Sequence, residues 1–157
     1  MRELRPAAGV GFAADVRVDT DQEWGRFAPS SAERAALAAL GDGLGVRIRP
    51  ARLRLADGSR VEIDGASEDG AVVVQLPLRG GEFTSQHRNK IMADMFKLSW
   101  LREHAAPGAR CVLCVRENAR GAFRGGGWLA RAATDSGIEV IEWDDAGLRT
   151  LVPDRRG

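Results

Sequence analysis

Four polar residues recur at helical spacing within the segment from Ser85 to about His104. They are Gln86, Lys90, Asp94 and Lys97. Because they follow one another at intervals of three or four residues, their side chains would share an arc of roughly 80° on a helix, beside an apolar stripe. An ammonium in such an arc can stabilise the negative charge that develops on a phosphate under attack. The alternative interpretation is a solvated face, on which the Lys90–Asp94 and Asp94–Lys97 ion pairs each contribute about 0.2–0.5 kcal/mol.

Two more polar side chains accompany strand signals. Asp64 lies at the end of one predicted strand, and Gln75 lies within a Val-rich run that we expect to be the next strand. If a hairpin pairs these strands, Asp64 and Gln75 lie close together, and a buried Gln75 amide needs a hydrogen-bond partner. A helix packed back over this sheet would bring Gln86 and Lys90 toward the same point. The alternative interpretation of Asp64 is the first residue of a turn.

The elements that must position these residues follow from periodicity, capping and turn signals. Ser30 and Glu33 fit a capping box at the start of a helix, which the glycines from Gly41 to Gly45 end. A helix that connects two strands makes them parallel, whereas short turns such as Asp-Gly make them antiparallel. The other expected elements are strands at Val46–Leu55, Arg60–Gly65 and Ala71–Arg79, a helix at Ser85–His104, a strand at Arg110–Val115, a helix at Trp128–Thr134 and a strand at Ile138–Trp143.

This order of elements predicts an α/β fold, in which one mixed sheet of about five strands is flanked by helices. We expect a single domain over residues 1–157, with its core at residues 30–143. Residues 1–29 are expected to form an N-terminal extension that holds at most a short strand. Residues 144–157 are expected to form an irregular tail with at most one short turn or strand.

The order helix, three-strand meander, helix and strand resembles the core of the restriction-endonuclease-like PD-(D/E)XK phosphodiesterases. The resemblance covers about Ser30 to Val115, and the stretch from Asp64 to Leu101 is also similar to small actinobacterial proteins of this type. It implies metal-dependent hydrolysis of phosphodiester bonds in DNA. In such a reaction Mg²⁺ or Mn²⁺ polarises the phosphate and activates water.

The same resemblance implies roles for individual residues. Glu33 matches the glutamate of the family's first helix, Asp64 the aspartate of its second strand, and Gln75 the glutamate of its third strand. Lys90 matches a lysine that has moved onto the following helix, and Gln86 lies one turn before it. The implied catalytic residues are Asp64, Gln75, Gln86 and Lys90, and the implied metal ligands are Glu33, Asp64 and Gln75.

Two departures from the family pattern weaken the expected site. Pro77 stands where the motif's lysine is usual, so Lys90 must supply the positive charge. Gln75 replaces a glutamate, which removes one negative charge and lowers the expected metal affinity. A catalytically inactive nuclease-fold protein that binds DNA or a protein partner is therefore a second hypothesis. Glu33 also has a structural alternative, as the residue that completes the helix cap with Ser30.

A loop rich in glycine and arginine precedes the helix expected at Trp128. Arg116, Arg120 and Arg124 could contact a nucleic-acid backbone there, and the alternative is a solvated loop. Backbone N–H groups at the helix start after residues 125–127 could bind a phosphate, which gives a third hypothesis, a small-ligand sensor. The loop has neither a Walker lysine nor a G-x-G-x-x-G motif to support nucleotide binding.

Composition limits these hypotheses further. With 157 residues and a net charge of +1, the chain is not a basic protein whose whole surface binds nucleic acid, although a local basic patch is allowed. No apolar run approaches the roughly 18–20 residues of a membrane helix, and the N-terminus has no signal-peptide core, so we expect a cytoplasmic protein without a membrane span. A homodimer or a partner protein is compatible with this composition. Cys111 and Cys114 are expected to be core thiols, because residues three apart on a strand face opposite ways.

Overall fold

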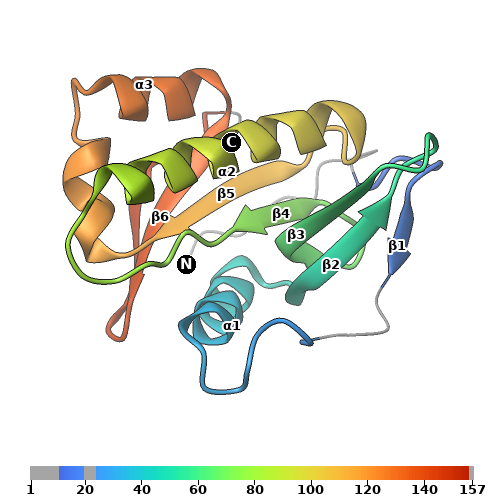
Figure 1. Ribbon diagram of the computed structural model, residues 1–157, viewed down its shortest axis with the longest axis horizontal. Helices are drawn as coiled ribbons and strands as arrows, with labels where there is room; N and C mark the ends of the chain where they lie inside the picture. The colour runs from blue at the N-terminus through green and yellow to red at the C-terminus, as the bar shows by residue number, and fades with distance from the viewer. Residues whose placement is uncertain (1–10, 20–23, 156–157) are drawn as a thin grey trace.

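The computed structural model describes residues 11–19 and 24–155 and contains one seven-stranded sheet whose strands lie side by side in sequence order (Figure 1). The elements are β1 (Arg17–Asp19), α1 (Ala32–Leu44), β2 (Ile48–Arg54), β3 (Arg60–Ser67), β4 (Val72–Gln75), α2 (Ser85–His104), β5 (Arg110–Val115), the 3-10 helix η1 (Glu117–Phe123), α3 (Trp128–Asp135), β6 (Ile138–Asp144) and β7 (Gly147–Val152). The predicted α/β class, with one mixed sheet flanked by helices, is confirmed.

The connections explain most of the strand directions. β2, β3 and β4 pair antiparallel through short connections, and β6 and β7 form an antiparallel hairpin. β1 also pairs antiparallel with β2, although the long connection between them contains α1. β4, β5 and β6 are parallel because α2 and α3 return the chain to the same edge of the sheet. Both crossover helices cover one face of the sheet, and α1 covers part of the other face (Figure 1).

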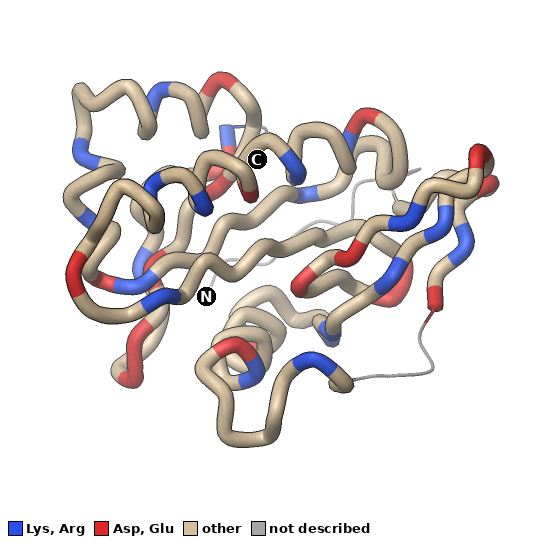
Figure 2. The backbone as a smooth tube through the Cα atoms, viewed as in Figure 1, with Lys and Arg blue, Asp and Glu red and all other residues tan. Residues whose placement is uncertain are grey.

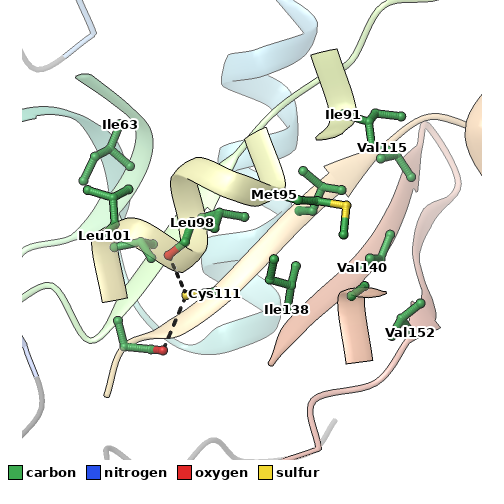
Figure 3. Close-up of a cluster of buried hydrophobic side chains, with 14 of the residues drawn as sticks. Ile63, Ile91, Met95, Leu98, Leu101, Cys111, Val115, Ile138, Val140 and Val152 are labelled. Atoms are coloured by element: carbon green, nitrogen blue, oxygen red, sulfur yellow. Dashed lines mark hydrogen bonds between the residues drawn. The ribbon is translucent and has the colours of Figure 1, made fainter. Parts of the chain in front are cut away.

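The central strands β4, β5 and β6 are buried on both faces, and their successive residues enter different cores. Val73 faces the α2 side with Leu98 and Leu113, whereas Val74 faces the α1 side with Leu37. This explains why the Val run of β4 is continuous rather than alternating. Figure 3 shows the larger core, in which apolar side chains of α2 meet those of β3, β5, β6 and β7.

Both cysteines are core thiols, as predicted. Cys111 and Cys114 are buried and unbonded to each other, and they belong to the two different cores. The Cys111 thiol lies 3.6 Å from the carbonyl oxygen of Leu98, which ties β5 to α2 (Figure 3). Burial raises the pKa of Cys114 to about 12, so this thiol is inert at neutral pH.

The prediction of about five strands is wrong, because the expected extension and the expected tail each contribute a strand. β1 pairs with the end of β2 and lies at one edge of the sheet. β7 pairs with β6 across a turn in which the Asp144 carboxylate accepts hydrogen bonds from the N–H groups of Ala146 and Gly147. Residues 1–10 and 20–23 of the expected extension lie outside the described residues.

The first helix starts one residue later than its sequence signals indicated and ends, as predicted, within the glycines from Gly41 to Gly45. Its N-cap is Ser31, whose hydroxyl accepts from the Arg34 N–H, so the predicted capping box of Ser30 with Glu33 is wrong. The helix also runs through Gly41 to a left-handed C-cap at Gly45. A Cβ on Gly41 would lie 2.7 Å from the Val46 carbonyl oxygen, so this glycine lets the chain fold back closely rather than ending the helix.

A β-bulge in β3 shapes the region where the polar residues gather. Ile63 lies opposite Ala51 and Ala66 lies opposite Arg49, so Asp64 and Gly65 together face the single residue Pro50. Proline has no N–H to donate, and an irregular ladder accommodates it. The bulge brings Gly65 so close to α1 that a Cβ there would lie 2.5 Å from a methyl group of Leu37.

This packing predicts that one glycine substitution lowers stability and that a second one does not. Gly65→Ala should lower the free energy of unfolding by about 1–3 kcal/mol, because the added methyl group overpacks the core beneath α1. Gly80→Ala is the matched control, because nothing lies within 4 Å of the Cβ position there. Urea unfolding of both variants would measure the difference, and equal stability of the two would contradict the close approach at the bulge.

Candidate functional site

Asp64 and Gln75 meet where β3 and β4 separate. The last residue pair of the ladder is Gly65 with Val74, and side chains continue the pairing beyond it. The Asp64 N–H donates to Gln75 Oε1 at 3.0 Å, and the Leu76 N–H donates to Asp64 Oδ2 at 2.9 Å. The structure therefore places Asp64 and Gln75 close together, as the predicted hairpin requires. The Gln75 side chain bonds the backbone of Asp64, and the Asp64 side chain bonds the backbone of Leu76, the residue after Gln75.

A third polar residue, Asp94 of α2, completes this group. Gln75 Nε2 donates to Asp94 Oδ1 at 3.1 Å, and Lys90 Nζ donates to the same oxygen at 2.8 Å. Asp94 is only 2 % exposed, whereas the Lys90 side chain is 59 % exposed. The interpretation of this helix face as solvated is therefore wrong for Asp94. The hydrogen-bonded chain of Asp64, Gln75, Asp94 and Lys90 is named here the polar cluster.

The electrostatics of the polar cluster centre on Asp94. Burial raises the pKa of its carboxyl group, the hydrogen bonds and charge of Lys90 and the Gln75 amide lower it, and the negative charge of Asp64 raises it further. The Oδ2 atom of Asp94 is buried and has no hydrogen-bond partner in the part of the chain that the structure describes. An unpaired buried carboxylate oxygen is costly, so the Oδ2 atom of Asp94 is the least compensated polar atom of the cluster.

Arg26 was not singled out in the sequence, yet it contacts the polar cluster directly. Its guanidinium donates to Asp64 Oδ1 at 3.4 Å, to Glu62 Oε2 at 3.2 Å, and to the carbonyl oxygen of Ile63. Asp64 and Arg26 are 38 residues apart, and Arg26 lies in an irregular segment before α1. No motif or spacing signals such a contact in advance.

Two of the predicted site residues lie outside this group. Glu33 is in the first turn of α1, on the other side of the sheet from α2, and it has no hydrogen bond or ion pair to the polar cluster. Gln86 accepts a hydrogen bond from Arg79 at 3.3 Å instead of joining Lys90. The structure thus brings together Asp64, Gln75 and Lys90, and it adds Asp94.

Pro77 takes part in a separate buried contact. His87 is 1 % exposed, and its Nε2 lies 3.2 Å from the Pro77 carbonyl oxygen, to which a protonated Nε2 donates. The Phe83 ring packs against the same imidazole, with 5.0 Å between ring centroids. This contact anchors the start of α2 over the end of β4, which positions Lys90 and Asp94 one and two turns further along.

Contacts within the fold hold part of the loop that carries Arg116, Arg120 and Arg124. Arg120 forms a two-fold hydrogen bond with the Glu142 carboxylate, both contacts being 2.6 Å, and this pairing lowers the pKa of Glu142. The Arg116 guanidinium lies 5.4 Å from the centre of the Trp143 ring. Arg116 and Arg120 therefore have partners within the fold, and the expected nucleic-acid contact of Arg116, Arg120 and Arg124 stays a prediction.

Comparisons with known proteins gave no relatives. No family model matches the chain, and neither the curated proteins nor the solved structures contain a match. Over residues 11–19 and 24–155, no three His, Cys, Asp or Glu side chains group as metal ligands, and no helix has the length and apolarity to cross a membrane. The candidate site therefore rests on its own geometry.

The raised pKa of Asp94 predicts a distinctive pH dependence of stability. Between the ordinary aspartate value of 3.8 and the raised folded value, the folded chain binds a proton that the unfolded chain has already lost. The free energy of unfolding of the wild type, relative to Asp94→Asn, should therefore fall as the pH rises through that window. Urea unfolding in EDTA from about pH 4 to about pH 7 would measure it.

Asp69→Asn is the matched control for this measurement. A hydrogen bond from the Ala71 N–H lowers the pKa of Asp69, so the wild type should gain stability relative to this variant as the pH rises. The stability of the wild type relative to Asp94→Asn should fall with rising pH, and its stability relative to Asp69→Asn should rise. If both differences changed in the same direction with pH, burial would not dominate the pKa of Asp94.

Proposed function

We propose that this chain is a nuclease-like protein that hydrolyses phosphodiester bonds in DNA, with Mg²⁺ or Mn²⁺ bound by the carboxylates of Asp64 and Asp94. The observation that carries the proposal is the set of hydrogen bonds that links Lys90 to Asp94, Asp94 to the Gln75 amide, and that amide to the Asp64 backbone N–H. The PD-(D/E)XK pattern expects a carboxylate where the chain has Gln75. Asp94 of α2 supplies a carboxylate in contact with that amide. It would therefore replace the negative charge that a glutamate at position 75 would carry.

The residues of the polar cluster fit a hard divalent cation. Mg²⁺ is commonly held by one or two carboxylates, with water and substrate phosphate completing its shell. Among the described residues no donor bonds Asp94 Oδ2, and the charge of Asp64 already disfavours ionisation of Asp94, so a cation would relieve both costs. When bound, the ion would polarise the phosphate and activate a water molecule.

The chain's own groups have separate tasks in this proposal. Lys90 is largely exposed while its ammonium is held at Asp94, so it can also contact a phosphate and stabilise negative charge there. Gln75 is a positioning residue, since its two amide ends fix the Asp94 carboxylate and the Asp64 backbone. The Leu76 N–H and Arg26 fix the Asp64 carboxylate.

A catalytically inactive protein that binds DNA or a partner protein is the second candidate. The Arg26 guanidinium supports it, because it places a positive charge on Asp64 where a metal ion would bind. Both ends of the Gln75 amide are also in use within the protein. Removal of the Arg26 charge would then be needed before Asp64 could bind an ion.

A third candidate, small-ligand binding, is supported by a hollow of about 560 Å³ at the start of α3. Its lining includes residues 125–127 and the side chains of Trp128 and Phe123. Trp128 is 62 % exposed there. None of the described residues that line the hollow is a buried polar residue that could fix a ligand, so the polar cluster supports the nuclease-like function better.

Plasmid cleavage in Mn²⁺ is the direct test of the first candidate. The wild type should cut DNA, and Asp94→Asn and Asp64→Asn should each reduce the rate by about 100-fold or more, because each removes a metal-binding carboxylate. Lys90→Ala should also reduce it, whereas Lys97→Ala, on the same helix, is the control and should not. Equal rates for Lys90→Ala and Lys97→Ala, or for Asp94→Asn and the wild type, would overturn the proposal.

Gln75→Glu tests whether the amide stands at a metal position. Without metal the variant should melt below the wild type, because a carboxylate replaces the Nε2 donor that faces Asp94. Mn²⁺ should raise its melting temperature more than it raises that of the wild type, since the new carboxylate adds a ligand.

Gln86→Glu is the matched control for this measurement. It adds the same charge one turn before Lys90, where the side chain accepts a hydrogen bond from Arg79. An equal Mn²⁺ response of Gln75→Glu and Gln86→Glu would show that the amide of Gln75 does not adjoin a metal site.

A further inference from the structure

Three arginines lie side by side across β1, β2 and β3. The strand register places Arg17 opposite Arg54, and Arg54 opposite Arg60. All three are exposed, while the residues beside them on each strand, Val18, Leu53 and Val61, pack against the core on the α2 side. In the part of the chain that the structure describes, no side-chain hydrogen bond or ion pair involves Arg17, Arg54 or Arg60. These three residues are named here the arginine row.

The arginine row costs stability rather than adding it. Residues directly opposite in neighbouring strands have Cβ atoms only about 4.5–5.5 Å apart, and like charges at that distance repel. The next row on the same face shows the balanced alternative, since there Arg52 lies between Asp19 and Glu62 and pairs with Glu62 at 3.0 Å. The nearby Asp57 carboxylate accepts from the Ser59 N–H in the turn between β2 and β3.

The arginine row lies on the same face as Asp64. On β3, Arg60 is followed at alternate positions by Glu62 and Asp64, and the Arg26 guanidinium bonds both carboxylates. At about 3.3 Å per residue, Asp64 lies about 13 Å along the strand from Arg60. The end of the meander that carries the row projects beyond α1 (Figure 1), and Figure 2 shows basic positions grouped on these strands.

We propose that the arginine row binds the phosphate backbone of duplex DNA on the face of the sheet that carries the Asp64 carboxylate. This inference rests on the proposed nuclease-like function and names the surface that holds its substrate. Guanidinium groups bind phosphate in planar, two-fold geometry. Strands about 4.8 Å apart give the row a length of about 10 Å, along which one DNA strand presents about three phosphates.

Salt dependence of DNA binding tests the arginine row separately from cleavage. We would measure the anisotropy of a labelled DNA duplex of about 20 base pairs in EDTA, over a salt series, for the wild type and for Arg17→Gln/Arg54→Gln/Arg60→Gln. Each lost phosphate contact lowers the log–log slope by about 0.9, so the triple variant should lose between about two and three.

The matched control removes the same net charge elsewhere, as Arg131→Gln/Arg149→Gln/Arg155→Gln on α3, β7 and the segment after it. Its slope should stay close to that of the wild type. Equal losses in the two triple variants would overturn the proposal, because net charge alone would then explain binding. Wild-type binding to anionic vesicles without binding to the duplex would overturn it as well.

Thermal melting would show whether the triple variant of the arginine row is folded. Removal of three repelling charges should leave the melting temperature of the row variant at or above that of the wild type. β1 is an edge strand, and charges at an edge also prevent sheet-to-sheet association. A row variant that aggregates, while its soluble fraction keeps the wild-type slope, would show that the arginines protect the edge, and would overturn a DNA contact.

The two proposals fail in distinguishable ways. If the row variant loses slope but the wild type does not cut DNA in Mn²⁺, the DNA-binding surface stands and hydrolysis fails. If the wild type cuts DNA and the row variant keeps both the slope and the same kcat/KM, hydrolysis stands and the arginine row fails.

Discussion

The buried carboxylate of Asp94 is the constraint on which the rest of the candidate site depends. Charge in a protein interior is tolerated only where hydrogen bonds and opposite charge compensate it. Gln75 from the sheet and Lys90 from α2 provide that compensation at one oxygen, and no donor from residues 11–19 or 24–155 bonds the other. The same hydrogen bonds join α2 to the point where β3 and β4 separate, so the architecture and the candidate chemistry share one set of contacts.

The bulge in β3 connects this point with the opposite face of the sheet. Asp64 accepts from the Leu76 backbone and from Arg26, while its own N–H bonds Gln75. The Asp64 backbone is therefore bonded to Gln75, which lies under α2. The Asp64 carboxylate is bonded to Arg26 on the face that carries the arginine row. The two acids therefore have different surroundings: Asp64 is held by Arg26 and the Leu76 N–H, and Asp94 is buried between α2 and Gln75.

Much of the fold could be predicted from local signals, because apolar periodicity and turn residues specify helices and buried strands. The edge strands escaped prediction for physical reasons: β1 has three residues, and four of the six residues of β7 are exposed, so neither shows a buried pattern. The burial of Asp94 could have been predicted, since it lies three residues after Ile91 and four before Leu98, both of which are in the core. Arg26 and the arginine row could not, because a distant contact and a strand register are products of tertiary packing.

Anomalous diffraction from crystals soaked in Mn²⁺ would test the central claim most directly. We expect a peak within about 2.2 Å of Asp94 Oδ2, the typical length of a bond between a hard divalent cation and a carboxylate oxygen, with Asp64 as a second ligand or bridged through water. Arg26 should withdraw from Asp64 in that structure. A fully soaked crystal with Mn²⁺ only at exposed acidic residues, and with the Arg26–Asp64 contact retained, would contradict a metal site in the polar cluster.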